Sequence, residues 1–313
     1  MILLCVESLI LKYLSTMKKS IVLVIAAAIC LAGCSLLDNQ STPKGYVKHC
    51  VRILDKNALY ADTPEWKDTM KAILSEDLQD METAHNAVAR AARVAGGKHS
   101  QLLPPVKDTA SYNETVPEVQ MIGESIAYVY LPAHSGVKVS DSLYTYTILN
   151  FLKAHTDAKG VVIDLRDNTG GNMYPMIAAL SPVIPDGDVI RFKNKKRTTP
   201  IPLEYITNSQ GVGASEKFPA ETPIAVLTND WTASSGEATL LCFRGLPNVK
   251  TFGTPTAGYA SANVTYPLAD GYTLLVTTSC DMARTGEVFC DDPIAPEVET
   301  NTPLKEAVNW LLN

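Results

Sequence analysis

Hydrophobic and polar positions divide the chain into two parts with different periodicity. In the first part, apolar residues recur every three or four positions, which is typical of helices that bury one face. The spacing predicts three such helices: Val47 to Ala61, Pro64 to Leu74 and Asp77 to Ala95. Gly96 and Gly97 would end the last one. We therefore expect a small helical N-terminal domain over residues 45–110.

From about Pro117 onward, short β-rich runs alternate with helical stretches. The expected strands are Ile126 to Leu131, Val161 to Leu165, Pro223 to Leu227, Val264 to Pro267, Thr273 to Thr277 and Glu287 to Phe289. The expected helical segments are Ser140 to Ala154, Met173 to Leu180, a helix from about Ser234, and Pro303 to Leu312. Recurring strand-turn-helix units favour parallel strands joined by crossover helices. The prediction for residues 111–313 is an α/β core.

The N-terminal segment has the pattern of an export signal. Lys18 and Lys19 precede an apolar run that ends at Leu31-Ala32-Gly33-Cys34. This arrangement resembles a bacterial lipoprotein signal, and the run is shorter than the roughly 20 apolar residues that span a bilayer. A simple membrane anchor or a buried helix is the alternative. Met17 already starts a complete signal, so residues 1–16 would be an upstream extension.

The lipoprotein pattern predicts processing and location. We expect residues 1–33 to be removed, the Cys34 thiol to be acylated, and residues 34–44 to form a polar tether. The protein would then be anchored in the cell envelope, on the periplasmic side of a bacterial membrane. Ser35, which follows the lipidated cysteine, is compatible with transport to the outer membrane.

Composition and charge narrow the function classes. Of the 313 residues, 46% are hydrophobic and 19% charged, as in an ordinary globular protein. The chain has 27 Lys and Arg against 33 Asp and Glu, a net charge of −6. Its longest unbroken basic cluster is Lys195-Lys196-Arg197, so a nucleic acid partner is not expected.

Cysteine and histidine positions give no metal-binding pattern. After processing at Cys34, four cysteines remain for other chemistry: Cys50, Cys242, Cys280 and Cys290. None belongs to a Cys-x-x-Cys or His-spaced motif, so we expect neither a metal nor a cofactor. Cys280 and Cys290 flank an expected strand-turn-strand and could form a disulfide in an oxidising compartment. Buried free thiols are the alternative.

Two loops that follow buried strands carry candidate chemistry. The first, Asp164 to Gly171, ends in two glycines whose bare N–H groups could line an oxyanion hole. The second contains Ser234-Ser235-Gly236-Glu237, which matches the Ser-x-x-Glu capping box. Ser234 could therefore be only a helix cap. Capping is the commoner use of such a quartet, but Ser234 could also be a nucleophile, since a helix N-terminus stabilises negative charge beside it.

Three motifs together resemble the S41 serine peptidases. They are Asp164-Leu165-Arg166-x-Asn168-x-Gly170-Gly171, Thr232-Ala233-Ser234-Ser235-Gly236-Glu237 and Gly253-Thr254-Pro255-Thr256-Ala257-Gly258. The resemblance implies a ClpP/crotonase-like α/β core with Ser234 as nucleophile. Many processing peptidases of the family carry a PDZ module, but residues 116–160 leave no room for one.

The resemblance also suggests the other catalytic residues. One branch of the family uses a lysine base immediately after the third motif, where this chain has Tyr259. The chain is therefore closer to the tricorn-like branch, in which a histidine at the end of the helical region is the base. His99 fits that place, with His134 as the alternative. The carboxylate that orients the histidine would be Asp291, with Glu287 and Glu237 as alternatives.

These residues predict a serine endopeptidase that needs no cofactor. Ser234 would attack the scissile carbonyl, His99 would take its proton, and the N–H groups of Gly170 or Gly171 and of Ser235 would bind the oxyanion. The expected partners are a peptide or unfolded protein substrate and the membrane that holds the lipid. A catalytically inactive peptide-binding lipoprotein on the same scaffold is the alternative function. An acyl-CoA enzyme of the crotonase type is disfavoured, since an exported protein meets no CoA.

Overall fold

A computed structural model of the protein describes residues 40–105, 116–135 and 138–313. The predicted signal segment over residues 1–33, Cys34 and most of the tether lie outside the described residues. The helices are α2 (Pro43–Asn57), α3 (Pro64–Ser75), α4 (Met81–Gly96), α5 (Lys138–Ala154), α6 (Met173–Ala179), α7 (Leu203–Ser209), α8 (Ser235–Leu241) and α9 (Pro303–Leu312).

The strands form two sheets. They are β1 (Gln101–Leu103), β2 (Glu118–Ile122), β3 (Ile126–Tyr130), β4 (Gly160–Asp164), β5 (Asp188–Lys193), β6 (Thr198–Pro202), β7 (Ile224–Thr228), β8 (Val249–Gly253), β9 (Ser261–Pro267), β10 (Thr273–Met282), β11 (Val288–Phe289) and β12 (Val298–Glu299). None of the described helices is both long enough and apolar enough to cross a bilayer.

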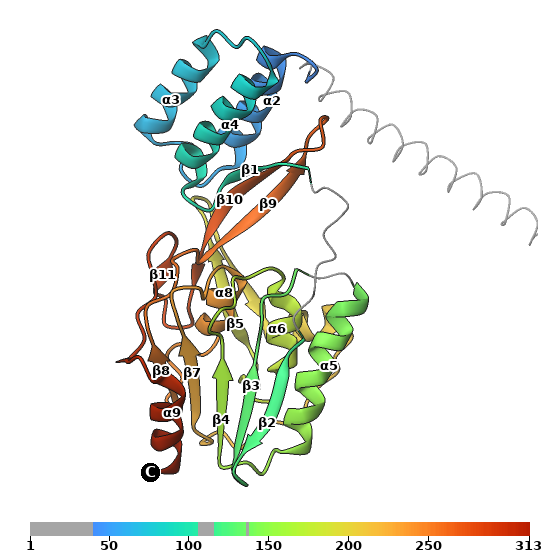
Figure 1. The fold of residues 1–313 in the computed structure, drawn as a ribbon, viewed down its shortest axis with the longest axis vertical. Coiled ribbons are helices and arrows are strands. Elements are labelled where there is room, and N and C mark those ends of the chain that lie inside the picture. The colour runs from blue at the N-terminus through green and yellow to red at the C-terminus, as the bar shows by residue number, and fades with distance from the viewer. Residues whose placement is uncertain (1–39, 106–115, 136–137) are drawn as a thin grey trace, which may run out of the picture.

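The central sheet confirms the α/β prediction. Its six strands run in the order β12-β8-β7-β4-β3-β2, all parallel except the antiparallel edge strand β2. Both faces of the inner strands are covered (Figure 1). Val161 and Ile163 pack in the cluster formed with α5, α6 and α8, whereas Val162 packs with α9 on the other face. The segment between β2 and β4 is occupied by β3 and α5 of this core.

A second, antiparallel sheet joins the core to the helical region. Its strands run β1-β10-β5-β6, and β9 and β11 also pair with β10. The long β9–β10 hairpin rises from the core toward α2 and α4 (Figure 1). Its Leu274 and Val276 share one hydrophobic cluster with Val88 and Ala91 of α4. The helical region therefore shares its core with a hairpin from the C-terminal part of the chain.

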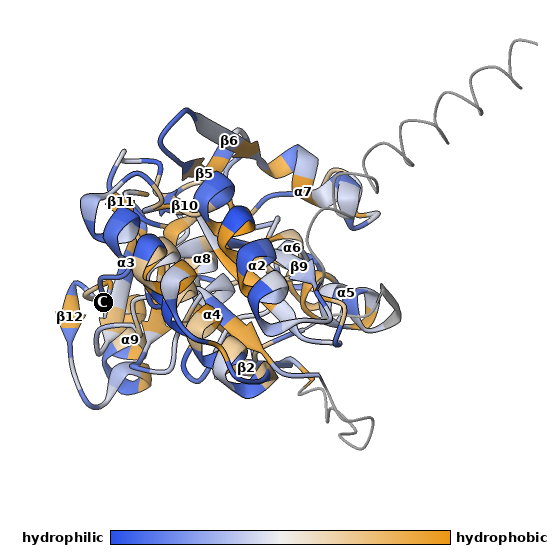
Figure 2. Cartoon of the chain, turned by 90° about the horizontal axis from the view of Figure 1, so that it is seen from above, coloured by the Kyte–Doolittle hydropathy of each residue, from blue (hydrophilic) through white to orange (hydrophobic). Residues whose placement is uncertain are grey.

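The three N-terminal helices begin at side-chain caps. Thr42 accepts a hydrogen bond from the Gly45 N–H (3.2 Å), and Pro43 occupies the first turn, so α2 starts four residues before the predicted Val47. Asp80 and Thr83 form a capping box at the start of α4. Figure 2, which looks down on this region, shows hydrophilic positions on the outward sides of α2 and α3.

A disulfide links Cys280 at the end of β10 to Cys290 after β11, with the two Cα atoms 4.7 Å apart. The sequence-based prediction of this pair is confirmed. Cys50 and Cys242 are free and buried. The disulfide therefore ties the segment that contains Asp291 to β10, the strand that contains Asp281.

Candidate active site

Ser234 occupies a strained turn between a strand and a helix. β7 ends at Thr228, and Ser234 is the N-cap residue of α8 with φ 52° and ψ −115°. Such backbone angles in a non-glycine residue cost roughly 1–3 kcal/mol and tend to be kept where function needs them. The local geometry therefore suits a reactive serine.

Glu237 holds this turn in place from inside the protein. Its side chain is fully buried, and Oε2 accepts hydrogen bonds from the backbone N–H groups of Ser234 (2.9 Å) and Tyr259 (2.7 Å). Oε1 accepts from the Thr256 hydroxyl (2.5 Å) and the Gly258 N–H (2.9 Å). Burial raises the pKa of Glu237, and the four hydrogen bonds oppose that shift. Glu237 therefore caps the start of α8 through the Ser234 N–H. It also anchors the third motif, Gly253 to Gly258.

Asn168 connects the first motif to the second. Its Nδ2 donates to the Leu131 carbonyl at the end of β3 (2.9 Å), and its Oδ1 accepts from the Gly170 N–H (3.0 Å). The backbone carbonyl of Asn168 accepts from the Ala233 N–H, next to Ser234 (2.9 Å). The side chain and the backbone carbonyl of Asn168 together therefore fix the glycine loop and the serine loop relative to each other.

The glycine loop presents one free N–H group beside Ser234. Gly171 has φ 116°, and a Cβ there would lie 2.1 Å from the His134 carbonyl oxygen, so only glycine fits. Within the described residues, the N–H groups of Gly171 and Ser235 donate no hydrogen bond, whereas that of Gly170 is used by Asn168. Ser235 Oγ donates to the Gly171 carbonyl (2.7 Å) and keeps the two donors together. The structure thus favours Gly171 and Ser235 over Gly170 as oxyanion donors.

His99 reaches the same cavity from the end of the helical region. Gly97 (φ 78°) ends α4, and the following turn places the imidazole in a buried position, 9% exposed. His99 Nδ1 lies 2.9 Å from the Ser261 hydroxyl of β9. Burial, and secondarily the charge of Lys98, lower the pKa of His99 to about 4. The ring is therefore neutral above pH 5 and able to accept a proton.

Tyr259 follows the third motif, at the sequence position where the other branch would have its lysine, and Lys98 packs against it. The Tyr259 ring packs edge-on against His99, with the ring centres 5.2 Å apart. Lys98 Nζ lies 4.5 Å above the Tyr259 ring and donates to the Ala257 carbonyl (3.0 Å). Lys98 does not line the cavity with Ser234. The amine is committed to these contacts, which leaves His99 as the base candidate.

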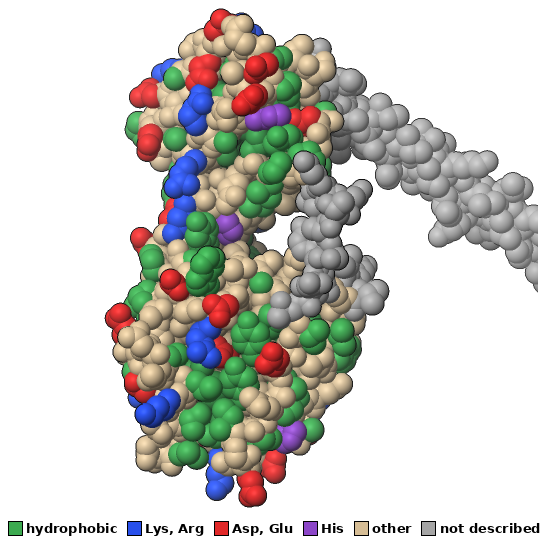
Figure 3. All heavy atoms as spheres, viewed as in Figure 1, with side chains coloured by type: hydrophobic (Ala, Val, Ile, Leu, Met, Phe, Trp, Pro, Cys, Tyr) green, Lys and Arg blue, Asp and Glu red, His purple; other side chains and the backbone are tan. Residues whose placement is uncertain are grey.

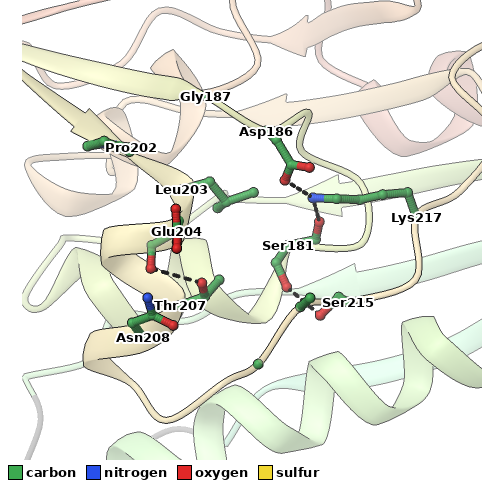
Figure 4. Close-up of a pocket in the computed structure, with 12 residues that line it drawn as sticks. Ser181, Asp186, Gly187, Pro202, Leu203, Glu204, Thr207, Asn208, Ser215 and Lys217 are labelled. Atoms are coloured by element: carbon green, nitrogen blue, oxygen red, sulfur yellow. Dashed lines mark hydrogen bonds and ion pairs between the residues drawn. The ribbon is translucent and has the colours of Figure 1, made fainter.

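Lys217, another amine near a cavity, is engaged elsewhere. It lines a separate cavity of about 390 Å³ next to α7 (Figure 4). Its Nζ donates to the carbonyls of Ser181 and Ile184 (2.9 Å each) and pairs with Asp186 (2.8 Å). Neither Ser234 nor His99 lines this cavity, so Lys217 is not a candidate base for Ser234.

The carboxylates expected to orient His99 are bound elsewhere. Asp291 lies against Gly97 and accepts from the Tyr60 hydroxyl (3.2 Å), so it approaches the His99 turn without contacting the ring. Glu287 forms a two-point ion pair with Arg244 (2.8 Å for both contacts), which lowers the pKa of Glu287 to about 2. With Glu237 committed to four donors, the hydroxyl of Ser261 is the group that contacts the imidazole Nδ1.

His134, the alternative base, makes its contacts outside the cavity that contains Ser234. Its Nε2 lies 2.7 Å from Asp141 Oδ1, and its ring packs against Tyr144. Its backbone N–H donates to the Gly170 carbonyl (3.0 Å), and its carbonyl accepts from the Asn172 N–H (2.6 Å). His134 does not line the cavity with Ser234. Its two backbone hydrogen bonds stabilise the glycine loop.

The site is a cavity of about 560 Å³ between the core and the β9–β10 hairpin. Ser234, Ser235 and Gly171 form its floor on the core side, and His99 and Ser261 lie on the hairpin side. Figure 3 shows the molecule narrowing at this level, between the helical part and the core. Within residues 40–105, 116–135 and 138–313, no three His, Cys, Asp or Glu side chains are grouped as metal ligands.

Sequence reasoning missed Ser261 and Asp281, which both line this cavity. Ser261 gave no local signal, because nothing in its sequence context indicates that β9 approaches the end of α4. Asn168 belonged to a recognised motif, but its contacts with two separate loops became visible only in three dimensions.

Comparison with known proteins gives a family and two relatives. Residues 125–300 match Peptidase family S41. The chain is 34% identical to the nisin-resistance protein of Lactococcus lactis over 284 residues, 86% of this chain and 87% of that one. It is 31% identical to the carboxy-terminal processing protease CtpA of Bacillus subtilis over 147 residues, 47% of this chain and 29% of that one.

A solved structure extends the similarity over both parts of the fold. A lipoprotein from Streptococcus agalactiae superimposes with a TM-score of 0.77 at 32% identity, covering 87% of this chain and 96% of that one. The match therefore includes the helical region as well as the α/β core. On the family match and the near full-length relative together, the chain belongs to peptidase family S41.

Proposed function

We propose that the protein is a serine peptidase in which Ser234 is the nucleophile and His99 the general base. One observation carries the proposal: a strained serine shares a cavity with a neutral, buried imidazole and with two unused backbone N–H groups. Nucleophile, base and oxyanion donors are the three elements that acyl transfer requires. Family membership supports the same chemistry.

Each residue has a defined role in this mechanism. Ser234 Oγ attacks the scissile carbonyl while His99 takes its proton, and the imidazolium then protonates the leaving amine. The Gly171 and Ser235 N–H groups bind the oxyanion, and each such donor is worth roughly 3 to 4 kcal/mol of barrier. Ser261 orients the imidazole through Nδ1, in the position that a carboxylate has in many triads. Water then attacks the acyl carbon while His99 takes its proton, and the bond to Ser234 Oγ breaks as the imidazolium returns that proton to the serine.

The relatives suggest which substrates to test. One of them is named for nisin resistance and another for carboxy-terminal processing, so nisin and unstructured peptides with free C-termini are suitable first candidates. Incubation of purified protein with each, followed by mass spectrometry of the products, should show defined fragments that Ser234→Ala does not produce. Intact substrate after long incubation with wild-type protein would instead favour the peptide-binding alternative.

The pH dependence of cleavage should reflect the lowered pKa of His99. A protonated imidazole cannot accept a proton, so kcat/KM falls as pH drops through the pKa of the free enzyme. With that pKa at about 4, activity should persist to pH 5, well below the ordinary histidine value of 6.5. Lys98→Met removes a neighbouring positive charge and should move the acid limb upward. Lys71→Met, on the exposed surface of α3, is the matched control. An acid limb at 6.5 in wild type would contradict the assignment.

We also propose that Cys34 carries a lipid that anchors the peptidase in the bacterial envelope. The Streptococcus agalactiae neighbour, which is described as a lipoprotein, supports this proposal, as does the Leu31-Ala32-Gly33-Cys34 sequence. Mass spectrometry of the mature N-terminus from native membranes should find Cys34 at the first position with its thiol acylated. A soluble chain with an unmodified Cys34 would refute the anchor.

A further inference from the structure

One carboxylate in the active-site cavity has no hydrogen-bond or ion-pair partner among the described residues. Asp281 lies in β10, is 2% exposed and lines the same cavity as Ser234 and His99. Its backbone N–H donates to the Ala260 carbonyl (3.0 Å), which fixes the residue in the cavity wall. Across the described part of the chain, Asp281 Oδ1 is the one buried side-chain oxygen or nitrogen that lacks a hydrogen-bond partner. Buried carboxylates are normally bonded or paired, so this one calls for a reason.

No positively charged group of the described residues acts on Asp281. Among the described residues it forms no ion pair, and the charged group that acts on it is Glu237, which has the same sign. Burial and this repulsion both raise the pKa of Asp281, because each disfavours the charged carboxylate. A cation that enters the cavity would supply the missing partner.

Part of the cavity wall is apolar. Met173 of α6, Phe192 of β5 and Ala238 of α8 all line the cavity. Ala238 follows Ser234 by four residues, so it lies one helical turn further along the same side of α8. Lysine and arginine side chains combine an apolar stem with a charged end. Such a side chain would place its stem along this wall and its charge at the acid.

We propose that Asp281 is a specificity-determining residue that binds the ammonium or guanidinium group of a substrate side chain close to the scissile bond. The substrates would then be peptides with lysine or arginine at one position next to the cleavage site. This inference rests on the proposed peptidase function. It adds a substrate class that the catalytic residues alone do not specify.

Matched peptides test the inference without any mutation. A peptide that the enzyme cleaves is resynthesised in matched pairs whose members differ at one position. One kind of pair has lysine or norleucine at that position, and the other has arginine or citrulline. The positions varied are the two that flank the scissile bond, one on each side. At one position we expect kcat/KM to be at least about tenfold higher for the charged member, because a buried polar group discriminates strongly against an analogue that leaves it unpaired. Equal rates within every pair would overturn the inference.

Variants then assign the preference to Asp281. Asp281→Asn keeps the size of the side chain and should bring the lysine-to-norleucine ratio close to one. Asp68→Asn, on the exposed surface of α3, should leave the ratio unchanged. A ratio that persists in Asp281→Asn would contradict the assignment, and thermal melts of both variants check the fold.

A binding measurement separates this inference from the peptidase function. Ser234→Ala protein is titrated with the same labelled peptides, and fluorescence anisotropy gives each Kd. Tighter binding of the lysine member, lost in Ser234→Ala/Asp281→Asn, would support the inference even if the wild type cleaved nothing. Cleavage by the wild type with equal binding of both members would refute the inference and leave the peptidase function intact.

Discussion

Ser234→Ala is expected to lower kcat/KM for peptide cleavage by roughly a thousandfold to a millionfold, the range seen when a catalytic serine is removed. Alanine has a Cβ, as serine does, so the backbone strain at φ 52° is the same in the variant and the wild type. The free energy of unfolding should therefore change by about 1 kcal/mol or less, as for a lost cap. Initial rates on one defined peptide, with thermal melts of the same samples, measure both effects.

The matching variant for this experiment is His99→Ala. If Ser234 and His99 act as one unit, the double variant should be no slower than either single variant, because such effects are not additive. Additive losses would show that the two residues act independently. Full activity in Ser234→Ala would reject the mechanism, and a fully active His99→Ala would transfer the role of base to another residue.

Glu237→Gln should have the largest effect on stability. Each carboxylate oxygen accepts two hydrogen bonds, and an amide keeps only one of those oxygens. The new NH₂ group would face N–H or O–H donors in a fully buried site. We expect the free energy of unfolding to fall by about 2–4 kcal/mol, the usual cost of leaving buried polar groups unsatisfied. Cleavage should fall as well, since the Ser234 N–H and the Gly258 turn lose their common anchor.

The control is Glu287→Gln, which makes the same chemical change at the surface. Glu287 is 46% exposed and pairs with Arg244, so its loss should cost at most about 1 kcal/mol. Urea unfolding of wild type and both variants gives the comparison. Equal stability of the two variants would show that the four hydrogen bonds of Glu237 contribute little.

Local sequence pattern was sufficient for the elements that carry their own signals. The helix after Asp77 is amphipathic and ends at Gly96-Gly97, and the strand from Val161 is an unbroken apolar run, so both were predictable within a few residues. In the second sheet, β9, β10 and β11 were predicted as strands, but β1, β5 and β6 and the pairing of the strands were not. β1, β5, β6 and β10 come from segments separated by up to about 170 residues, and the apolar and polar residues of β5 and β6 do not alternate clearly enough to be recognised. Non-local pairing decides such strands.

The candidate site also contains residues that motifs predict and residues that only the three-dimensional contacts identify. Ser234, Gly171 and His99 were found because motifs and their order along the chain identify them. The candidate oxyanion donors were reduced to Gly171 and Ser235 because Asn168 accepts a hydrogen bond from the Gly170 N–H, a contact that motif spacing does not reveal. Asp291 was chosen by its position before a Pro-Glu pair, yet Tyr60 binds it, a residue 231 positions away. The presence of Ser261 and Asp281 in the cavity depends on where the β9–β10 hairpin lies relative to α8, which the sequence pattern does not predict.

Covalent labelling tests most directly whether Ser234 is an activated nucleophile. A fluorophosphonate reacts only with a serine whose proton is removed and whose oxyanion is bound. Intact mass and peptide mapping of the treated protein should show one adduct per chain, on Ser234. The adduct should be absent from Ser234→Ala and formed much more slowly in His99→Ala. No adduct on folded wild-type protein, or an adduct on another residue, would contradict the account.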